Sequence, residues 1–466
     1  MIKKSAAGYV LIVVVAAAFS GCGSYEGAKI RREHAEAFRE SLDEKIYQVL
    51  SAGKKLGLRD CIEIALRNNL QVRSSEIGQR IAKLERQVSF SYFLPQVALD
   101  YQYTRFDPQP EIIFGSSSVA MQDARVREIS WGIQQSIFDP STWFLYWMYS
   151  RGEEIAELVT EYTRQMMVFR VTALYFNCLT LTESVEALES QISAAAALAK
   201  ELSAFKAEGL VSGWQAEQAQ VLLLARETEL SRTKRALVEA KADLLSAMGL
   251  LPLAEICFGV EMPLQAPQAP VEELVFEALV SNRQMQISDR EVAIEEEKVK
   301  TAISAFLPRL GGFASRTYTS DSYLKYGSFW ATGVSGVLTV FDGFANINEY
   351  KAAKERRTQA YVNREQAALT LMVQVLKADL SVKDAQEQIV LSEKSLDAVS
   401  SRFCEVEHQW QEGLVDFSEM LSVLAEKDDA EMALMRADYR LQVSIATLQN
   451  VMGLTNTEIG EGTDEQ

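Results

Sequence analysis

Side chains that could perform chemistry are few and scattered in this sequence of 466 residues. The two histidines, His34 and His408, lie far apart in the sequence and have no nucleophile or metal ligand at a recognisable spacing. Four of the five cysteines form no CxxC pair and lie near no histidine, so we interpret them as small buried apolar residues and leave a periplasmic disulfide open. These are Cys61, Cys178, Cys257 and Cys404. We therefore expect no enzyme activity, no cofactor and no metal site.

The remaining cysteine, Cys22, is where the sequence predicts covalent chemistry. A positively charged start, an apolar run over residues 6–19 and small residues before Cys22 are typical of a cleaved export signal covering residues 1–22. The small residues resemble a bacterial lipobox, in which cleavage leaves a lipidated cysteine carrying palmitate. An ordinary signal followed by a chance cysteine is the alternative. Gly23 follows instead of the Asp that favours inner-membrane retention in enteric lipoproteins, which favours the outer membrane.

Charge and hydropathy limit the partners. The net charge of −17 argues against nucleic acid as a partner. After the signal, no stretch reaches 18 apolar residues, so a membrane-crossing part would have to consist of strands.

Two helices of unusual length organise the chain. Residues 345–412 contain no Gly or Pro over 68 residues, which as one helix would span about 100 Å. Residues 141–208 form a counterpart with a single glycine. Both carry apolar residues at alternating steps of three and four, the spacing of a coiled-coil seam that needs a partner helix. The seams are Leu181, Val185, Leu188, Ile192, Ala195, Ala199 and Leu202, and Leu396, Val399, Phe403, Val406 and Trp410.

Alternating segments precede each long helix. An amphipathic helix over residues 58–88 leads to strands over about 96–106 and 126–138, separated by a polar loop at 108–123. A second, less regular pair is predicted at about 310–318 and 329–341. Each run is close to the length of a tilted membrane strand, although a soluble hairpin shows the same alternation.

Five landmarks occur twice in the same order, which indicates an internal duplication. They are the Asn-bearing amphipathic helices, the Phe-Leu-Pro strand entries, the Phe-Asp strand exits, the Gly-Leu-Val turns and the Met-Gly-Leu segments. We predict a first repeat at 23–249, a Pro-rich linker at 250–270, a second repeat at 271–454 and a disordered acidic tail at 455–466. Four strands cannot close a membrane barrel, so two copies with eight strands or three with twelve must share one.

These landmarks, with the lipobox-like Cys22, resemble the TolC-like outer-membrane efflux family in its lipoprotein (NodT/OprM-like) branch. The resemblance implies a mainly α fold with β structure, in which the duplicated helix, β-hairpin, long helix and return helix units assemble as a homotrimer. Its twelve-stranded outer-membrane β-barrel would stand on a long periplasmic α-helical barrel. It implies a passive exit duct for small molecules or drugs in a tripartite efflux pump or type I secretion system. The partners would be a periplasmic adaptor (membrane fusion protein), an inner-membrane pump of RND or ABC type and outer-membrane lipid.

The resemblance also implies roles for the turns between long and return helices. Glu419 matches a family aspartate that forms an acidic gate ring, but Ser422 occupies the position of the second gate aspartate. Trp410 falls where the family often has a tyrosine that bonds between hairpins. For Glu419 an exposed helix carboxylate is an equal alternative, and for Trp410 core packing is favoured. Adaptor contact is expected at Gly209, Leu210, Val211, Gly413, Leu414 and Val415.

Aromatic residues of the strands are candidates for the belt at the membrane interface, with ordinary strand packing as the alternative. They are Tyr101, Tyr103, Trp131 and Trp330. The competing function for the whole chain is a lipid-anchored periplasmic coiled-coil structural protein whose hairpins are soluble.

Overall fold

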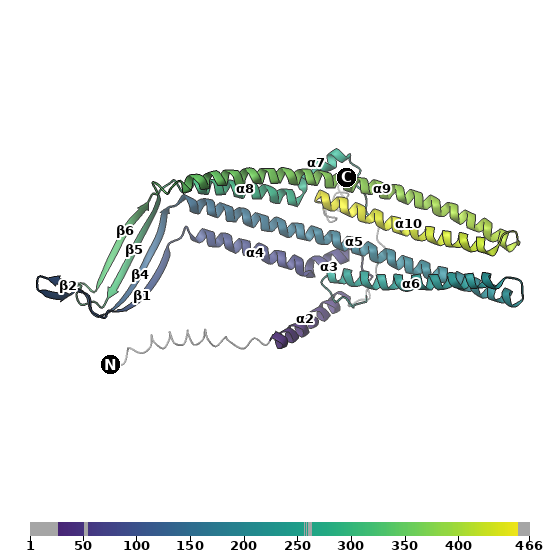
Figure 1. Cartoon of the computed structure of the whole chain (residues 1–466), viewed down its shortest axis with the longest axis horizontal. Coiled ribbons are helices and arrows are strands. Elements are labelled where there is room, and N and C mark those ends of the chain that lie inside the picture. The colour runs from purple at the N-terminus through teal and green to yellow at the C-terminus, as the bar shows by residue number, and fades with distance from the viewer. Residues whose placement is uncertain (1–26, 51–54, 256, 258, 260–262, 455–466) are drawn as a thin grey trace.

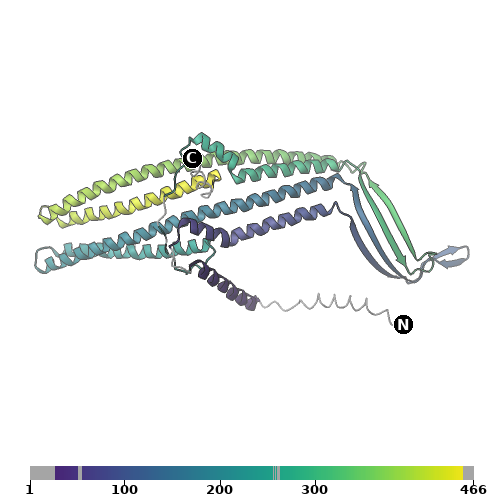
Figure 2. The same cartoon turned by 180° about the vertical axis from the view of Figure 1, so that it is seen from behind.

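The computed structural model describes residues 27–50, 55–255, 257, 259 and 263–454. The described chain is elongated, with a strongly curved sheet at one end and two helical hairpin tips at the other. Helices connect these two ends in both views (Figures 1 and 2). The protein is mainly α with one principal sheet, as the sequence predicts.

The principal sheet has four antiparallel strands in the order β1-β4-β5-β6, and the β4–β5 pair joins the two repeats. The two outer strands, β1 and β6, are the edges of this sheet. The strands are β1 (Gln96–Arg105), β4 (Arg125–Phe138), β5 (Arg309–Thr319) and β6 (Ser328–Val337).

The strand register separates two chemically different faces. Leu99 pairs with Trp131, Trp131 with Arg316, and Arg316 with Trp330, so these four residues form one row on one face. We call this the apolar face. Its alternating rows carry Val97, Leu99, Tyr101, Tyr103, Ile129, Trp131, Ile133, Ala314, Tyr318, Trp330 and Thr332. The opposite face is mostly polar, with Gln96, Asp100, Gln102, Glu128, Ser130, Gln134, Ser315 and Thr317, and it also carries Val126, Phe313 and Phe329. We call it the polar face.

Two details of the strand prediction were wrong. The last strand ends at Val337 and not near residue 341, because Val337 pairs with Arg309 and the chain before Arg309 is Pro308, which has no N–H to extend the ladder. The predicted loop at 108–123 contains a small hairpin. Its strands are β2 (Glu111–Phe114) and β3 (Ser117–Ala120), joined through Gly115 at φ 68°.

Each long helix follows the second strand of its repeat, directly after β4 in the first repeat and after a short connection at 338–344 in the second. In the first repeat, the Asp139 side chain accepts a hydrogen bond from Ser141 N (3.1 Å) and Pro140 occupies the first turn, which together start the helix. Its 68 residues span about 100 Å. Each long helix pairs with its return helix, and the predicted seam residues are buried or half-buried in the pairing. These helices are α5 (Pro140–Ala207) with α6 (Gly213–Ala247), and α9 (Ala345–Gln411) with α10 (Phe417–Met452).

The single helix predicted over 58–88 is wrong, because it is interrupted at Asn69. The Asn69 side chain accepts hydrogen bonds from Gln71 N (2.8 Å) and Val72 N (3.2 Å), and so caps a new helix. Asn282 does the same in the second repeat. The resulting helices are α3 (Leu58–Asn68), α4 (Leu70–Ser91), α7 (Val271–Ser281) and α8 (Arg283–Ser304), with α2 (Gly27–Leu50) preceding them.

Each repeat is closed by an Asn–Gly junction midway along the long helices. Asn69 Nδ2 donates to Ala247 O (2.8 Å), and Asn282 Nδ2 donates to Val451 O (2.9 Å). The glycines after the return helices, Gly249 and Gly453, have φ of 69° and 85°. Two of the hydrophobic clusters surround these junctions, one per repeat, and a third lies under the hairpin tips.

The cysteine prediction was right for two residues and wrong for two. Cys61 and Cys178 are buried in the cluster of the first repeat, where burial raises the pKa of the Cys178 thiol to about 12. Cys257 and Cys404 are exposed, because Cys257 lies in the linker and Cys404 lies off the α9 seam. Within the described residues no disulfide joins any of the four. None of the described helices is both long and apolar enough to span a membrane.

Candidate functional site

The predicted site residues lie at opposite ends of the molecule. The candidates for gate and adaptor contact lie at the two hairpin tips, and the candidate belt aromatics lie on the sheet. Cys22, the predicted lipidation site, is outside the described residues, as are the signal and the predicted acidic tail.

The hairpin tips have the same backbone in both repeats. Gly209 and Gly413 adopt φ of 74° and 72°, a left-handed conformation that ends each long helix. The N–H groups of Leu210 and Leu414 then donate back to carbonyls of the last helical turn, at 2.9 and 2.8 Å. Both leucine side chains are left in solvent, 67% and 71% exposed, so each tip presents an apolar knob.

A hydrogen bond that the sequence analysis missed joins the two tips. Gln215 Nε2, in the first turn of α6, donates to Asp416 Oδ1 at 2.8 Å, although 201 residues separate them. Asp416 caps α10 and also accepts from Ser418 Oγ (2.7 Å) and Phe417 N (2.8 Å). These donors hold the pKa of Asp416 below its usual value, with Ser418 the largest cause. The signal that could have found the residue is its position after the Gly-Leu-Val turn, where a cap is required.

The two gate candidates have different surroundings. Trp410 is half-buried and its ring lies 5.8 Å from that of Phe417. It borders a groove of about 380 Å³ between the tips, whose other lining residues are Glu201, Phe205, Leu210, Val211 and Gln411. Glu419 is exposed in the first turn of α10. The structure therefore brings Trp410, Leu210 and Val211 together and leaves Glu419 in solvent.

A buried ion pair links the return helices behind the tips. Arg226 of α6 lies 3.1 Å from Asp428 and 3.5 Å from Asp429 of α10, and the Arg226 and Asp428 side chains are only 13% and 9% exposed. Burial raises the pKa of Asp428 to about 6, partly offset by Arg226. The sequence gives no warning of this pair, because its members belong to different repeats.

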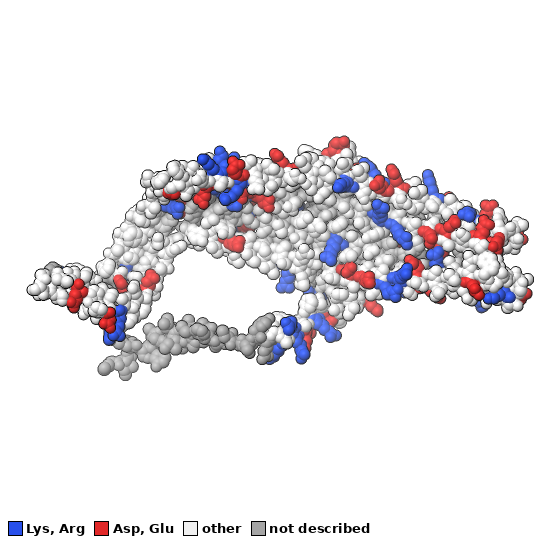
Figure 3. All heavy atoms as spheres, viewed as in Figure 1, with Lys and Arg blue, Asp and Glu red and all other residues white. Residues whose placement is uncertain are grey.

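The belt candidates share the apolar face. The rings of Trp131 and Trp330 pack edge to face at 5.0 Å, and Tyr101 and Tyr103 are exposed. Figure 3 shows that most of the visible sheet surface is uncharged, while Lys, Arg, Asp and Glu gather at its end away from the helices. A surface of this kind is expected beside lipid.

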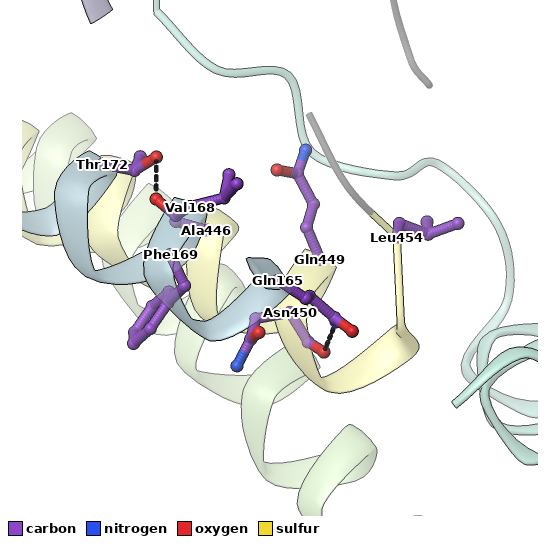
Figure 4. A pocket seen from close by; sticks show the side chains of 8 residues that line it. All are labelled: Gln165, Val168, Phe169, Thr172, Ala446, Gln449, Asn450 and Leu454. Carbon is purple, nitrogen blue, oxygen red and sulfur yellow. Dashed lines mark hydrogen bonds between the residues drawn. The ribbon is translucent and has the colours of Figure 1, made fainter. Parts of the chain in front are cut away.

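One pocket between the helices of the two repeats is very small. Figure 4 shows a pocket where α5 and α10 meet, in which Gln165 Nε2 donates to Asn450 O at 2.6 Å. Its volume of about 10 Å³ is that of one water molecule, too small for a substrate. Across the described part of the chain, no group of three or more His, Cys, Asp or Glu side chains is arranged to bind a metal ion.

Comparison with known proteins is consistent with this arrangement. Residues 274–454 match the model of the outer membrane efflux protein family. The match spans most of the second repeat. The predicted resemblance to outer-membrane efflux proteins is thereby confirmed, while its assignment to the lipoprotein branch stays a prediction. No curated protein matches the chain in sequence.

Solved structures show the same fold over most of the chain. CusC matches with a TM-score of 0.76 at 15% identity, over 85% of this chain and 92% of CusC. The CmeC outer membrane channel of Campylobacter jejuni matches with a TM-score of 0.75 at 16% identity, over 87% and 88%. The open state of the MtrE outer membrane channel of Neisseria gonorrhoeae matches with a TM-score of 0.71 at 16% identity, over 85% and 89%.

Proposed function

We propose that this chain is the outer-membrane channel of a tripartite efflux pump or type I secretion system, a passive exit duct for small molecules. The observation that supports the proposal most directly is the four-stranded sheet, with one apolar face, one polar face and two open edges. An open edge in lipid costs several kcal/mol for each unsatisfied backbone group, so the edges must pair with other copies.

The edges are suited to such pairing. Because β1 and β6 run in opposite directions and each has ten residues, β6 of one copy can continue the antiparallel order with β1 of the next. Repetition of this contact closes a ring. Three copies give twelve strands, enough for a water-filled lumen lined by the polar face, and a homotrimer is the assembly that the resemblance implies.

The helices of each copy leave the sheet on the same side and would continue the duct through the periplasm. The exposed apolar tips, with Gly209, Leu210, Val211, Gly413, Leu414 and Val415, are then placed for a periplasmic adaptor that couples the duct to an inner-membrane pump. Glu419, exposed at the same end, would form an acidic ring that attracts cations, and Trp410 would set the packing behind it. A lipid on Cys22 would anchor the protein at the periplasmic leaflet of the outer membrane.

The test is channel formation by the purified protein in a planar bilayer. Stable, ion-conducting steps are expected from the wild type. The Leu99→Lys and Ile133→Lys variants, which place charge on the apolar face, should lose membrane assembly, whereas the neighbouring Gln134→Lys on the polar face should keep it. If all three variants assemble equally, the hairpins face water and the chain is a lipid-anchored periplasmic coiled coil instead.

The gate role of Glu419 has its own readout. The Glu419→Ala channel should conduct with a weaker preference for cations, and Glu412→Ala, which removes an exposed carboxylate just before the turn, serves as the matched control. An unchanged cation preference in Glu419→Ala would remove this residue from the gate.

A further inference from the structure

The end of the apolar face that lies away from the helices carries a cluster of arginines. Arg105 of β1 pairs directly with Arg125 of β4, and Arg127 lies two residues further along β4 on the same face. Arg316 follows on β5, in the row of Trp131 and Trp330. We call these four residues the arginine rim.

Such an arrangement costs stability unless an anion is present. Like charges directly opposite each other in an antiparallel pair repel, and here both members of a pair are arginines. The one ion pair found for the rim in the described chain joins Arg105 to Asp107 at 3.9 Å, and both side chains are mostly exposed. An exposed pair of this kind contributes little.

In the adjoining loops, Asp123 and Asp321 are hydrogen-bonded to neutral donors. Asp123 accepts hydrogen bonds from Ser322 N (2.7 Å) and Ser322 Oγ (3.0 Å), and Asp321 accepts from Asp123 N (3.0 Å). Glu128 belongs to the polar face. The hydrogen bonds of Asp123 and Asp321 orient both carboxylates but leave them negatively charged. The positive charge is instead a property of the strand face: by register, the apolar face of the described strands carries Arg105, Arg125, Arg127 and Arg316 and no Asp or Glu. This is the side of the sheet that the proposed function turns towards lipid.

Arg316 sits at the inner margin of the rim, among aromatic rings. Its guanidinium carbon lies 4.9 Å from the centre of the Tyr318 ring and 5.4 Å from that of Trp330, and its Nε is buried without a hydrogen-bond partner. An arginine on the lipid-facing side is costly at the middle of a bilayer and nearly free at its interface. The row of Arg316, Trp131 and Trp330 is thus best placed at the inner margin of the interface. Arg127 lies four residues and the Arg105–Arg125 pair six residues further along the strands, towards the headgroups.

We propose that the arginine rim binds the phosphate groups of a phosphorylated glycolipid in the outer leaflet. Guanidinium groups bind phosphate through paired N–H donors, so one phosphate between Arg105 and Arg125 would replace their repulsion with two charge-assisted contacts. The aromatic rings would contact the acyl chains below. This inference rests on the proposed function, since it requires the apolar face to meet lipid.

The experiment measures binding of lipid A carrying two phosphates to the detergent-solubilised, full-length protein by native mass spectrometry. Dephosphorylated lipid A and inorganic phosphate are measured in parallel. The Arg125→Gln/Arg127→Gln variant should bind lipid A at least about tenfold more weakly than the wild type. Lys351→Gln/Arg356→Gln, which removes two exposed charges from α9, should bind like the wild type.

A thermal shift gives a second, independent readout. Without lipid A, Arg125→Gln should have a melting temperature at least as high as that of the wild type, because the Arg105–Arg125 repulsion is removed. Addition of lipid A should raise the melting temperature of the wild type more than that of Arg125→Gln. Equal lipid affinity of wild type and double variant, or equal binding of the dephosphorylated lipid, would overturn the proposal. Inorganic phosphate that competes as well as the lipid would make this a simple anion site. Channel conductance separates this proposal from the proposed function. If the Arg125→Gln/Arg127→Gln variant conducts and binds lipid A like the wild type, the arginine rim is refuted while the channel function stands.

Discussion

Substitution of Gly249 by alanine tests the junction that closes the first repeat. Gly249 has φ of 69°, and a Cβ placed on it would lie 2.5 Å from Asn68 O and 2.8 Å from Asn68 C. Both are backbone atoms at a helix end that Asn69 holds in place, so they cannot move aside as a flexible side chain would. The left-handed conformation costs an L-residue about 1 kcal/mol, and the overlap adds about 1–3 kcal/mol.

The chain offers a matched control at the hairpin tips. Gly209 has φ of 74° and its added Cβ would meet nothing within 4 Å, so Gly209→Ala should cost only the conformational part, about 1 kcal/mol. Gly453→Ala, whose Cβ would lie 2.9 Å from Ser281 O, should resemble Gly249→Ala. Thermal unfolding followed by far-UV circular dichroism in detergent should show a midpoint decrease about two to four times larger for the junction variants.

Equal decreases for Gly249→Ala and Gly209→Ala would refute this reasoning. They would mean that the left-handed conformation alone sets the cost, and that the approach of Gly249 to Asn68 is loose enough to admit a methyl group.

Three further outcomes are expected. The pKa of Asp428 is about 6 in the folded protein, above its ordinary 3.8, so the folded protein favours the neutral carboxylic acid. The free energy of unfolding therefore decreases as the pH rises through 6, because the buried carboxylate must then ionise. From pH 5 to pH 7.5 the wild type should lose about 1 kcal/mol that Asp428→Asn does not lose, measured by urea unfolding, and parallel pH curves would contradict this. Asn282→Ala removes a helix cap and the bond to Val451 O, and should cost about 1–3 kcal/mol in the same assay, whereas an unchanged midpoint would show the cap to be dispensable. Gln215→Ala, which cuts the bond to Asp416, should increase the open probability of single channels, and unaltered gating would mean that the tips are held by packing alone.

Much of the fold follows from patterns in the sequence that depend only on neighbouring residues. The absence of Pro and the near-absence of Gly predict the long helices, and the alternation of apolar and polar residues predicts the strands. The break at Asn69 was missed because an asparagine inside an apolar 3.6-residue period is compatible with one helix. The cap from Asn69 to Gln71 N and Val72 N is local, but the bond from Asn69 Nδ2 to Ala247 O joins residues 178 positions apart and is contained in no local pattern.

The site was less predictable for the same reason. The turn glycines Gly209 and Gly413 follow from local conformation, and both were found. Contacts between repeats, such as Gln215 with Asp416 and Arg226 with Asp428, pair residues about 200 positions apart. A single sequence holds no signal for which of many polar residues meet across that separation.

The central position of the β4–β5 pair has a consequence for biogenesis. During synthesis the first repeat emerges with only β1 and β4 in the principal sheet, and an isolated two-stranded hairpin is marginally stable at best in water. The central β4–β5 pair can form only after β5 has been synthesised, more than 170 residues after β4 ends. Insertion into the bilayer therefore has to wait until the second repeat has been exported, while the Asn69 junction can already close within the first.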